Sequence, residues 1–343
     1  MLPPISVVVI GFNEAQHLYA CFDAILASNY PEGNMELIYV DSGSTDYSVD
    51  IANKYTSSVY IEPEWPTAAR NRNRGLIESK NHIVHFIDGD IVIDPDYLRF
   101  AVEKLLEGDV QVVCGYLEEK SIKGLGKILL HDYGNRKPGL IDAPGAGGTF
   151  IKSALVKVNG WDERIPRGEE TEIGERLYKA GYKIWYLNKR MGIHDFGVKN
   201  ISQFLKKQIN EGLSLGAITK ISSISPFIKN SGRISRNNLV FHLISLLLIL
   251  SSVIFHSGGY IIIAFVLYSC YLYLKYRVIK KVKNPDSIKF YFLMNYTRSF
   301  VLYGFFKFRI LFFFLPESRK ISFQKRMDIN FCLRNGTSFT GNS

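Results

Sequence analysis

Cysteine is scarce in this chain. Its four cysteines, Cys21, Cys114, Cys270 and Cys332, stand far apart, and no pair has the C-x-x-C spacing of a zinc site or a redox motif. A chain of 343 residues can form a hydrophobic core without disulfide or metal cross-links. We therefore expect reduced thiols in a protein that faces the cytosol.

The sequence also lacks a signal peptide and has few acidic residues in its C-terminal part. The N-terminus lacks the basic region and the long apolar region of a signal peptide. Residues 236–343 contain only 3 Asp and Glu against 15 Lys and Arg, whereas residues 1–235 contain 29 against 27. The net charge of +10 therefore belongs to the C-terminal part. A basic segment that is also apolar and aromatic indicates contact with membrane lipids before nucleic acid.

Two long apolar runs, residues 239–255 and 259–274, flank a three-residue turn without charge. A single helix through both runs would be about 54 Å long, against about 30 Å for the hydrocarbon core of a membrane. A transmembrane helical hairpin is therefore predicted, and it could also join two copies of the chain. Lys and Arg flank it on both sides, which places the N-terminal domain in the cytoplasm. The alternative is a buried helical hairpin in a soluble domain.

A third apolar stretch, residues 300–315, contains Lys307 and Arg309 near its middle. A basic residue at the bilayer centre costs about 2.5–3.5 kcal/mol, which favours a helix on the membrane surface over one that spans it. The predicted organisation is a cytoplasmic domain at 1–235, a transmembrane hairpin at 236–277 and a basic, aromatic membrane-interface segment and tail at 278–343.

The N-terminal domain alternates strand and helix signals. Residues 5–10, 37–40 and 83–87 are continuous apolar strands, with helical patterns between them. This pattern predicts an α/β fold with a mostly parallel sheet covered by helices on both faces. In such sheets, ligands bind outside the carboxyl ends of the strands. Two acidic clusters, residues 41–46 and 88–90, follow strands and so fall at such ends.

Asp88 and Asp90 lie on either side of a glycine that lets the backbone approach a ligand. Two carboxylates in this arrangement suit a hard divalent cation that bridges phosphate oxygens, although the same residues are also common in plain turns. Asp41 ends the second strand, where it could accept hydrogen bonds from a base or a ribose. Ser44 or Asp46 is expected to cap the next helix.

Three arginines at positions 70, 72 and 74 begin a predicted helix. Arg70 and Arg74 can share one face with Arg72 elsewhere, so the group is either a solvated basic helix start or a clamp for a diphosphate.

Glu169, Glu170 and Glu172 open a later helix that is predicted to end before Gly181. The helix dipole explains acids in a first turn, but one of them could act as a base. His194, after a strand at 183–187, is either structural or a metal ligand. The glycine-rich residues 145–150 match no phosphate-binding motif, and we expect a loop that lies closely under a bulky ligand.

Taken in order, these segments resemble the family 2 inverting glycosyltransferases, whose catalytic domain has the GT-A fold. The resemblance covers about residues 5–215. It rests on SVVVIGFNE at 6–14, VDSGSTD at 40–46, RNRGL at 72–76, FIDGD at 86–90, GGTF at 147–150, GWDE at 160–163 and GEETE at 168–172. The chain lacks the QxxRW motif of processive synthases, which indicates the addition of a single sugar.

The resemblance implies roles for individual residues. Donor binding falls to Asn13, Glu14, Asp41, Arg72, Asn73 and Asp88, and a Mg²⁺ or Mn²⁺ ion to Asp90 and Asp88 with His194. Gly147, Gly148, Trp161 and Asp162 would lie on the acceptor side. The catalytic base would be Glu170, where the family commonly has Asp, or its neighbour Glu169.

The predicted function is transfer of one sugar from a nucleotide-diphosphate sugar, with inversion, to a lipid-linked or glycan acceptor at the cytoplasmic membrane face. Such a reaction belongs to the synthesis of cell-surface polysaccharide or glycolipid. One alternative is nucleotidyl transfer, although the chain lacks a glycine-rich, basic loop after its first strand. The other is a membrane-anchored scaffold without activity. The presence of both acidic pairs, Asp88 with Asp90 and Glu169 with Glu170, argues against it.

Overall fold

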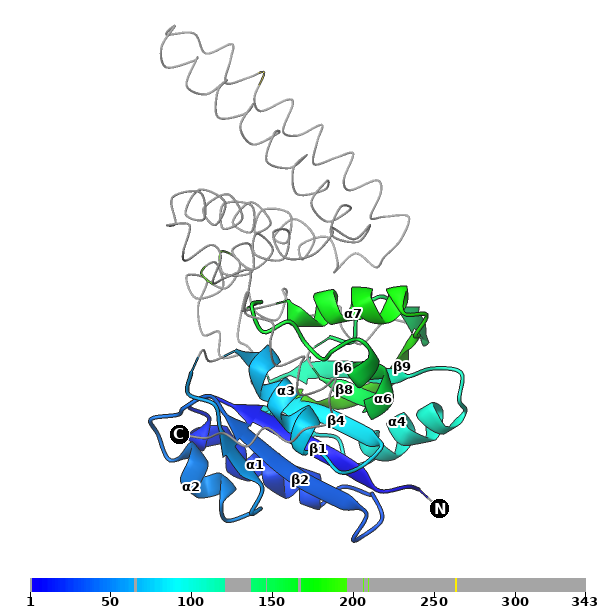
Figure 1. The fold of residues 1–343 in the computed structure, drawn as a ribbon. Coiled ribbons are helices and arrows are strands. Elements are labelled where there is room, and N and C mark those ends of the chain that lie inside the picture. Colours follow the sequence, from blue (N-terminus) through cyan, green and yellow to red (C-terminus); the bar gives the residue numbers. More distant parts are fainter. Residues whose placement is uncertain are drawn as a thin grey trace, which may run out of the picture.

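A nine-stranded sheet with helices on both sides forms the part of the chain that the structure describes (Figure 1). The structure is a computed structural model, which describes residues 2–64, 67–120, 137–145, 147–165 and 168–195, and the single residues 206, 209 and 263. The strands are β1 (Ile5–Gly11), β2 (Met35–Asp41), β3 (Val59–Ile61), β4 (Ile83–Asp88), β5 (Ile91–Ile93), β6 (Val112–Glu119), β7 (Gly139–Ile141), β8 (Gly148–Ile151) and β9 (Ile184–His194). The helices are α1 (Ala15–Leu26), α2 (Ser48–Ala52), α3 (Ala68–Glu78), α4 (Tyr97–Leu106), α6 (Lys152–Lys157) and α7 (Glu169–Lys179).

The first half of the sheet is parallel, as the apolar strands predict. Its strand order is β3-β2-β1-β4, and all three neighbouring pairs run in the same direction. Six of the seven residues of β1 are buried, which agrees with a strand covered on both faces.

The second half of the sheet is mixed, so the prediction of a mostly parallel sheet is wrong there. The order continues β8-β6-β9-β5, with β7 also paired to β9. Strand β8 lies antiparallel between β4 and β6, and β9 pairs antiparallel with both β5 and β7. The sequence pattern of a short apolar strand does not record its direction, because side chains alternate in the same way in either orientation.

Alternate residues of the strands feed two hydrophobic cores, one on each face of the sheet. Val7 and Val9 of β1 pack with α1, α2 and α4, whereas Val8 and Ile10 pack with α3, α6 and α7. This alternation is the two-residue period of a strand. The result is a three-layer arrangement, which confirms the expected α/β class.

Helix α3 lies closely against β1 because of a glycine. A Cβ on Gly75 would collide with the side chain of Val8. At its start, the Thr67 hydroxyl accepts the Arg70 N–H at 3.2 Å and caps the helix. These contacts place the backbone of the arginine-rich segment firmly over the sheet.

Strand β9 is longer than predicted. It extends to His194, so this residue ends a strand and does not follow one. The end of α7 agrees with the prediction, since Gly181 follows it with a positive φ of 83°.

The predicted hairpin at 236–277 and the membrane-interface segment at 278–343 lie outside the described residues, apart from Ile263. Within the part that is described, no helix is both long and apolar enough to cross a membrane.

Candidate functional site

The carboxyl ends of β1, β2 and β4 meet at one edge of the sheet. Gly11 lies opposite Asp41, and Ile10 lies opposite Asp88. After β4 the chain turns back over β1, and the Gly89 N–H donates to the Ile10 carbonyl oxygen at 2.8 Å. A Cβ on Gly89 would meet a leucine of α1, so the close approach at this glycine is to the protein's own helix, not to a ligand. The two predicted acidic segments are thus neighbours at this edge.

Asp41 is completely buried at the end of β2. Its Oδ2 accepts the Tyr39 hydroxyl at 2.8 Å and the Ser44 hydroxyl at 2.7 Å, and its Oδ1 accepts the Ser44 N–H at 2.5 Å. The carboxylate that we expected to contact a nucleoside therefore holds its own loop together, and its contact with a nucleoside stays a prediction.

The loop between β1 and α1 is tied to the loop after β2. Asn13 Oδ1 accepts the Thr45 N–H at 2.8 Å. The N-cap residue of α2 is Tyr47, not Ser44 or Asp46 as expected, but Asp46 accepts the N–H of Ser48, the first residue of the helix, at 3.0 Å. Its other oxygen accepts the N–H of Ala15, the first residue of α1, at 3.1 Å. Asn13 thus remains in an exposed loop at the sheet edge, where donor binding stays a prediction for it.

Glu14 lies at the start of α1, beside a histidine that the sequence analysis missed. Glu14 Oε2 is 2.8 Å from His17 Nδ1, and His17 Nε2 is 3.7 Å from Asp195 Oδ2. Burial raises the pKa of Glu14, the hydrogen bond with His17 opposes this, and the charge of Asp90 adds to it. Glu14 therefore lies near Asp90 at this edge of the sheet, and its side chain keeps 24% of its surface exposed.

Phe12 is another residue of this edge that the sequence analysis missed. It follows β1 directly and is 50% exposed, although large apolar side chains near a strand end are often buried. Its position at the predicted ligand-binding edge was the signal that could have identified it. An exposed aromatic ring here offers a stacking surface to a planar ligand.

Asp90 and His194 come together through the pairing of β5 with β9. Ile91 lies opposite His194 in this register, and His194 Nε2 is 3.2 Å from Asp90 Oδ2. Asp90 Oδ1 is buried and has no hydrogen-bond partner. An unpartnered carboxylate oxygen next to an imidazole nitrogen fits a divalent cation such as Mn²⁺. Within the described ranges, no group of three or more His, Cys, Asp and Glu is arranged to hold a metal ion.

Arg72 lies at the centre of the site, with only 2% of its side chain exposed. Its Nη1 donates to Glu169 Oε1 at 2.5 Å, and its Nη2 donates to Asp88 Oδ1 at 3.0 Å. The same Nη2 is 3.8 Å from Glu170 Oε1. Arg72 thus links α3 to the end of β4 and to the start of α7. We expected Asp88 at the metal, but one of its oxygens accepts a hydrogen bond from this arginine.

The three acids at the start of α7 have three different environments. Glu169 is buried and paired with Arg72, and Glu172 is buried and paired with Arg176. Glu170 keeps 21% of its side chain exposed. Burial raises the pKa of Glu170 to about 8, the charge of Glu169 adds to this, and Arg72 opposes it. Of the three, Glu170 has the accessible carboxylate with the affinity for a proton that a general base requires.

The other two arginines of α3 face a different partner. Glu62 Oε2 is 2.8 Å from Arg70 Nε, and Glu62 Oε1 is 3.1 Å from Arg74 Nη1. Arg74 also pairs with Glu78 at 3.0 Å. The three arginines therefore form no common diphosphate clamp, because Arg70 and Arg74 share one face and Arg72 lies on another.

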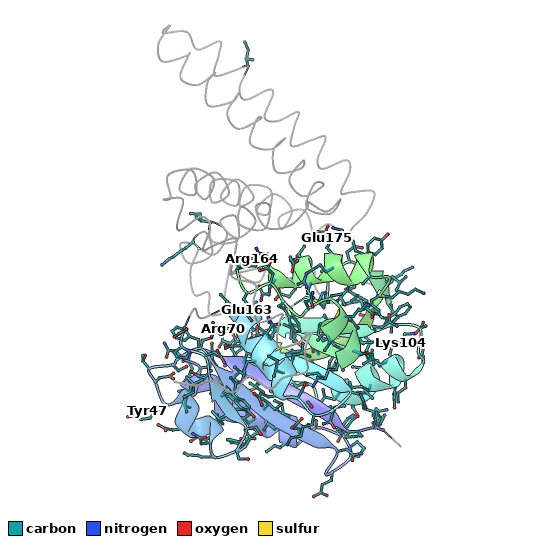
Figure 2. The ribbon with its side chains drawn as sticks, in the orientation of Figure 1. Tyr47, Arg70, Lys104, Glu163, Arg164 and Glu175 are labelled. Atoms are coloured by element: carbon teal, nitrogen blue, oxygen red, sulfur yellow. The ribbon has the colours of Figure 1, made fainter. Side chains whose placement is uncertain are left out.

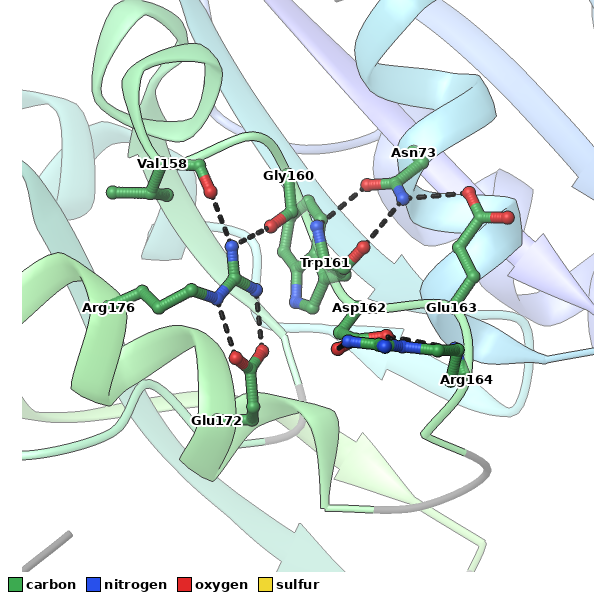
Figure 3. Close-up of polar contacts among 9 residues, drawn as sticks. All are labelled: Asn73, Val158, Gly160, Trp161, Asp162, Glu163, Arg164, Glu172 and Arg176. Atoms are coloured by element: carbon green, nitrogen blue, oxygen red, sulfur yellow. Dashed lines mark hydrogen bonds and ion pairs between the residues drawn. The ribbon is translucent and has the colours of Figure 1, made fainter. Parts of the chain in front are cut away.

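Asn73 joins α3 to the loop that follows α6 (Figure 3). Its Oδ1 accepts the Trp161 N–H at 2.8 Å, and its Nδ2 donates to the Trp161 carbonyl oxygen and to Glu163 Oε1, both at 2.8 Å. Asn73 is 1% exposed. The structure thus gives Asn73 a positioning role, whereas the resemblance implied donor binding.

Arg176 holds the same loop from the side of α7. Its Nε and Nη2 donate to the two Glu172 oxygens at 2.6 and 2.5 Å, and its Nη1 donates to the carbonyl oxygens of Val158 and Gly160 (Figure 3). The loop of residues 158–163 is therefore fixed by both helices that carry the candidate site.

Trp161 and Asp162 are 2% and 3% exposed, and their place on the acceptor side stays a prediction. The Trp161 ring packs edge-on against Phe86 and Phe150, with centroids 4.8 and 5.6 Å apart. Asp162 pairs with Arg164 at 2.5 Å. Both residues stabilise the loop, because Trp161 packs in an aromatic cluster and Asp162 forms a local ion pair.

Gly147 and Gly148 are required by the sheet itself. A Cβ on Gly147, whose φ is 102°, would come within 2.8 Å of the Phe86 carbonyl oxygen. Gly148 pairs with Phe86 where β8 joins β4. The close approach that we expected under a ligand is therefore an approach to the neighbouring strand.

Residues 6–149 match the family described as "Glycosyl transferase family 2". This segment is a glycosyltransferase family 2 domain. The glycosyltransferase AglE of Haloferax volcanii is 26% identical over 222 residues, which cover 62% of this chain and 72% of that protein. The glycosyltransferase GlyA of Streptococcus pneumoniae is 27% identical over 210 residues, which cover 54% of this chain but only 30% of GlyA.

The fold of the glycosyltransferase domain is GT-A-like. The mannosyltransferase PcManGT from Pyrobaculum calidifontis, solved in complex with GDP-Man and Mn²⁺, superposes with a TM-score of 0.57 and 15% sequence identity. The superposition covers 90% of this chain and 87% of that one. At this identity the likeness establishes the fold alone.

Glu163, in the loop that Asn73 holds, has an unusual carboxyl group. Burial raises the pKa of Glu163 to about 7, against the opposing effects of the hydrogen bond from Asn73 and of the charge of Arg70 (Figure 2). Since the pKa is higher in the folded chain than in the unfolded chain, ionisation of Glu163 destabilises the fold.

We predict that Glu163→Gln weakens the pH dependence of stability. In the wild type, the stability that the protonated carboxyl contributes is full below about pH 4.5 and is lost as the pH rises to about 7. Glutamine cannot ionise and can still accept the Asn73 hydrogen bond. Urea unfolding across this pH range should therefore show a smaller decrease for the variant, whereas Glu103→Gln, an exposed position on α4, should match the wild type. Equal slopes for wild type and Glu163→Gln would contradict the prediction.

Proposed function

We propose that this protein transfers one sugar from a nucleotide-diphosphate sugar to an acceptor hydroxyl, with inversion at the anomeric carbon and with the help of a divalent cation. The single observation that carries the proposal is the bridge that Arg72 makes from Asp88, which ends β4 two residues before Asp90, to Glu169, the neighbour of the accessible Glu170, in a chain whose residues 6–149 match glycosyltransferase family 2. One side of the edge suits the leaving diphosphate, and the other suits deprotonation of the acceptor.

On the donor side, Asp90 and His194 would hold a Mg²⁺ or Mn²⁺ ion. The unpartnered Asp90 Oδ1 supports this assignment. A bound cation would neutralise the charge that develops on the leaving diphosphate. The similar structure PcManGT contains GDP-Man and Mn²⁺, which is consistent with this chemistry here. The exposed ring of Phe12 would stack on the base of the nucleotide.

On the acceptor side, Glu170 would act as the general base. It would take the proton of the acceptor hydroxyl while the oxygen of that hydroxyl forms its bond to the anomeric carbon and the bond to the diphosphate breaks. One displacement of this kind inverts the configuration at the anomeric carbon. Glu169 is unsuited to the task because its carboxylate is buried against Arg72.

The acceptor is proposed to be lipid-linked or a glycan, used in the synthesis of surface polysaccharide or glycolipid. The support is the apolar, basic C-terminal part of the sequence. We propose that residues 236–277 anchor the chain in the membrane, with the glycosyltransferase domain on the cytoplasmic side and residues 278–343 at the lipid surface.

Anchoring predicts that the full chain stays in the membrane pellet after alkaline carbonate extraction, whereas a chain that ends at residue 235 is released. Loss of two apolar runs removes the hydrophobic surface that holds an integral protein in lipid. Release of the full chain by carbonate would contradict the proposed anchor.

For the cation, we predict that Asp90→Asn weakens binding of UDP or GDP in the presence of Mn²⁺ by about 10- to 100-fold. Calorimetry with and without Mn²⁺ measures this, and Asp96→Asn, at an exposed position after β5, is the matched control. Hydrolysis of UDP-glucose, UDP-GlcNAc and GDP-mannose should release a nucleoside diphosphate and a sugar. Metal-independent binding that is unchanged in Asp90→Asn would contradict the cation site. Release of pyrophosphate from a nucleoside triphosphate would indicate nucleotidyl transfer.

For the base, we predict that Glu170→Gln lowers the rate of hydrolysis or transfer by about 10²- to 10⁴-fold, with folding and donor binding retained. The wild-type rate should rise with pH as Glu170 loses its proton, with a midpoint at about 8 if its pKa governs the step. The residual rate of the variant should lack this rise. Glu175→Gln, on the same helix and paired with Lys179, should behave as the wild type. A Glu170→Gln enzyme with normal turnover would refute the assignment.

A further inference from the structure

The start of α7 has no cap of its own. Its N-cap residue is Gly168, with a φ of 79°, which has no side chain to accept a hydrogen bond from the first turn. Three glutamates crowd this turn, and their charges repel one another. The position of the turn, and with it the direction of Glu170, must therefore be set by contacts from elsewhere in the fold.

Arg72 supplies the contact that reaches the first turn. It lies 97 residues earlier in the chain, on α3, and its Nη1 donates to Glu169 Oε1. Its Nη2 donates to Asp88 at the end of β4. The planar guanidinium therefore joins two different elements with two nitrogens held at a fixed separation.

The element that carries Arg72 is itself well fixed. Its neighbour Asn73 is bonded on both sides of its amide to the loop at Trp161, and Gly75 seats the helix on β1. The far part of α7 is fixed to the same loop through Arg176. Arg72 thus sits on a rigid support from which it can hold the near end of α7.

We propose that Arg72 is the positioning residue for the catalytic base: it holds Glu169 and Asp88 at once and thereby fixes Glu170 at a set distance from the donor side of the site. This inference rests on the proposed function. Glu169 becomes an anchor for the helix, and Glu170 becomes the base. The two adjacent glutamates then have separate roles, because Arg72 donates a hydrogen bond to Glu169 at 2.5 Å but lies 3.8 Å from Glu170.

The rival role for Arg72 is direct binding of the donor, which the family resemblance implies. Two features of the structure favour positioning. The side chain is 2% exposed, and both terminal nitrogens already donate to protein carboxylates. The two roles differ in what they alter, because a donor ligand affects donor affinity, whereas a positioning residue affects the rate of the bound complex.

The test is Arg72→Lys in the full chain. Lysine keeps the positive charge but has one nitrogen and cannot join two carboxylates as a planar fork. We expect kcat for hydrolysis of the nucleotide sugar that the wild type uses to fall about 10²-fold, as for a misplacement of about 1 Å. We expect the calorimetric Kd for UDP or GDP with Mn²⁺ to change less than about threefold. Arg74→Lys is the matched control, because Arg74 lies on another face of α3 with Glu62 and should leave both values unchanged.

A second variant keeps the inference testable if Arg72→Lys does not fold. Glu169→Ala removes the anchor and should also lower kcat by at least about tenfold with the Kd unchanged. The double variant should lose little more than the stronger single variant, since both changes break one contact. Normal kcat in folded Arg72→Lys, a loss confined to Kd, or additive losses would overturn the inference. If the wild type itself hydrolyses no nucleotide sugar, the proposed function fails as well, whereas an active wild type with an equally active Arg72→Lys overturns only the positioning role.

Discussion

The arrangement at the sheet edge depends on the buried charge of Arg72. A guanidinium with 2% exposure must be balanced by carboxylates, and Asp88, Glu169 and Glu170 surround it. Removing one partner of such a buried pair typically costs about 3–5 kcal/mol, because the remaining charge is left without compensation. This requirement brings α7 to α3 and β4, which lie about 80 residues or more earlier in the sequence. The candidate site is thus held together by charges that lie next to the residues proposed to perform its chemistry.

The charges at this edge are not balanced within the protein. Five carboxylates, those of Glu14, Asp88, Asp90, Glu169 and Glu170, lie near one arginine and two histidines. Burial raises the pKa of both Glu14 and Asp88, and Asp90 adds to it in both cases. A bound divalent cation would relieve this repulsion, since an opposite charge favours the ionised form of each carboxylate. Burial, with the charge of Glu169 added to it, likewise raises the pKa of Glu170.

The sequence pattern predicted most of the fold because local rules apply to most of it. Apolar runs at 5–10, 37–40 and 83–87 became β1, β2 and β4, since a strand buried on both faces needs continuous apolar residues. The direction of β8 and the length of β9 were not predictable in this way. Strand pairing depends on long-range contacts, such as Phe86 with Gly148 and Ile91 with His194. Such contacts produce no periodic pattern in the sequence.

For the candidate site, the sequence by itself determined which residue types are present. It also determined that two acidic segments follow strands and that a third opens a helix. Only the tertiary structure decided which side chains remain available. Three motif residues already interact within the protein: Asn73 forms hydrogen bonds, Trp161 packs against aromatic rings, and Asp162 forms an ion pair. Glu169 and Glu170 are adjacent and chemically identical, and no local rule separates them. Their difference comes from the guanidinium of Arg72, 97 residues earlier, which pairs with one and leaves the other accessible.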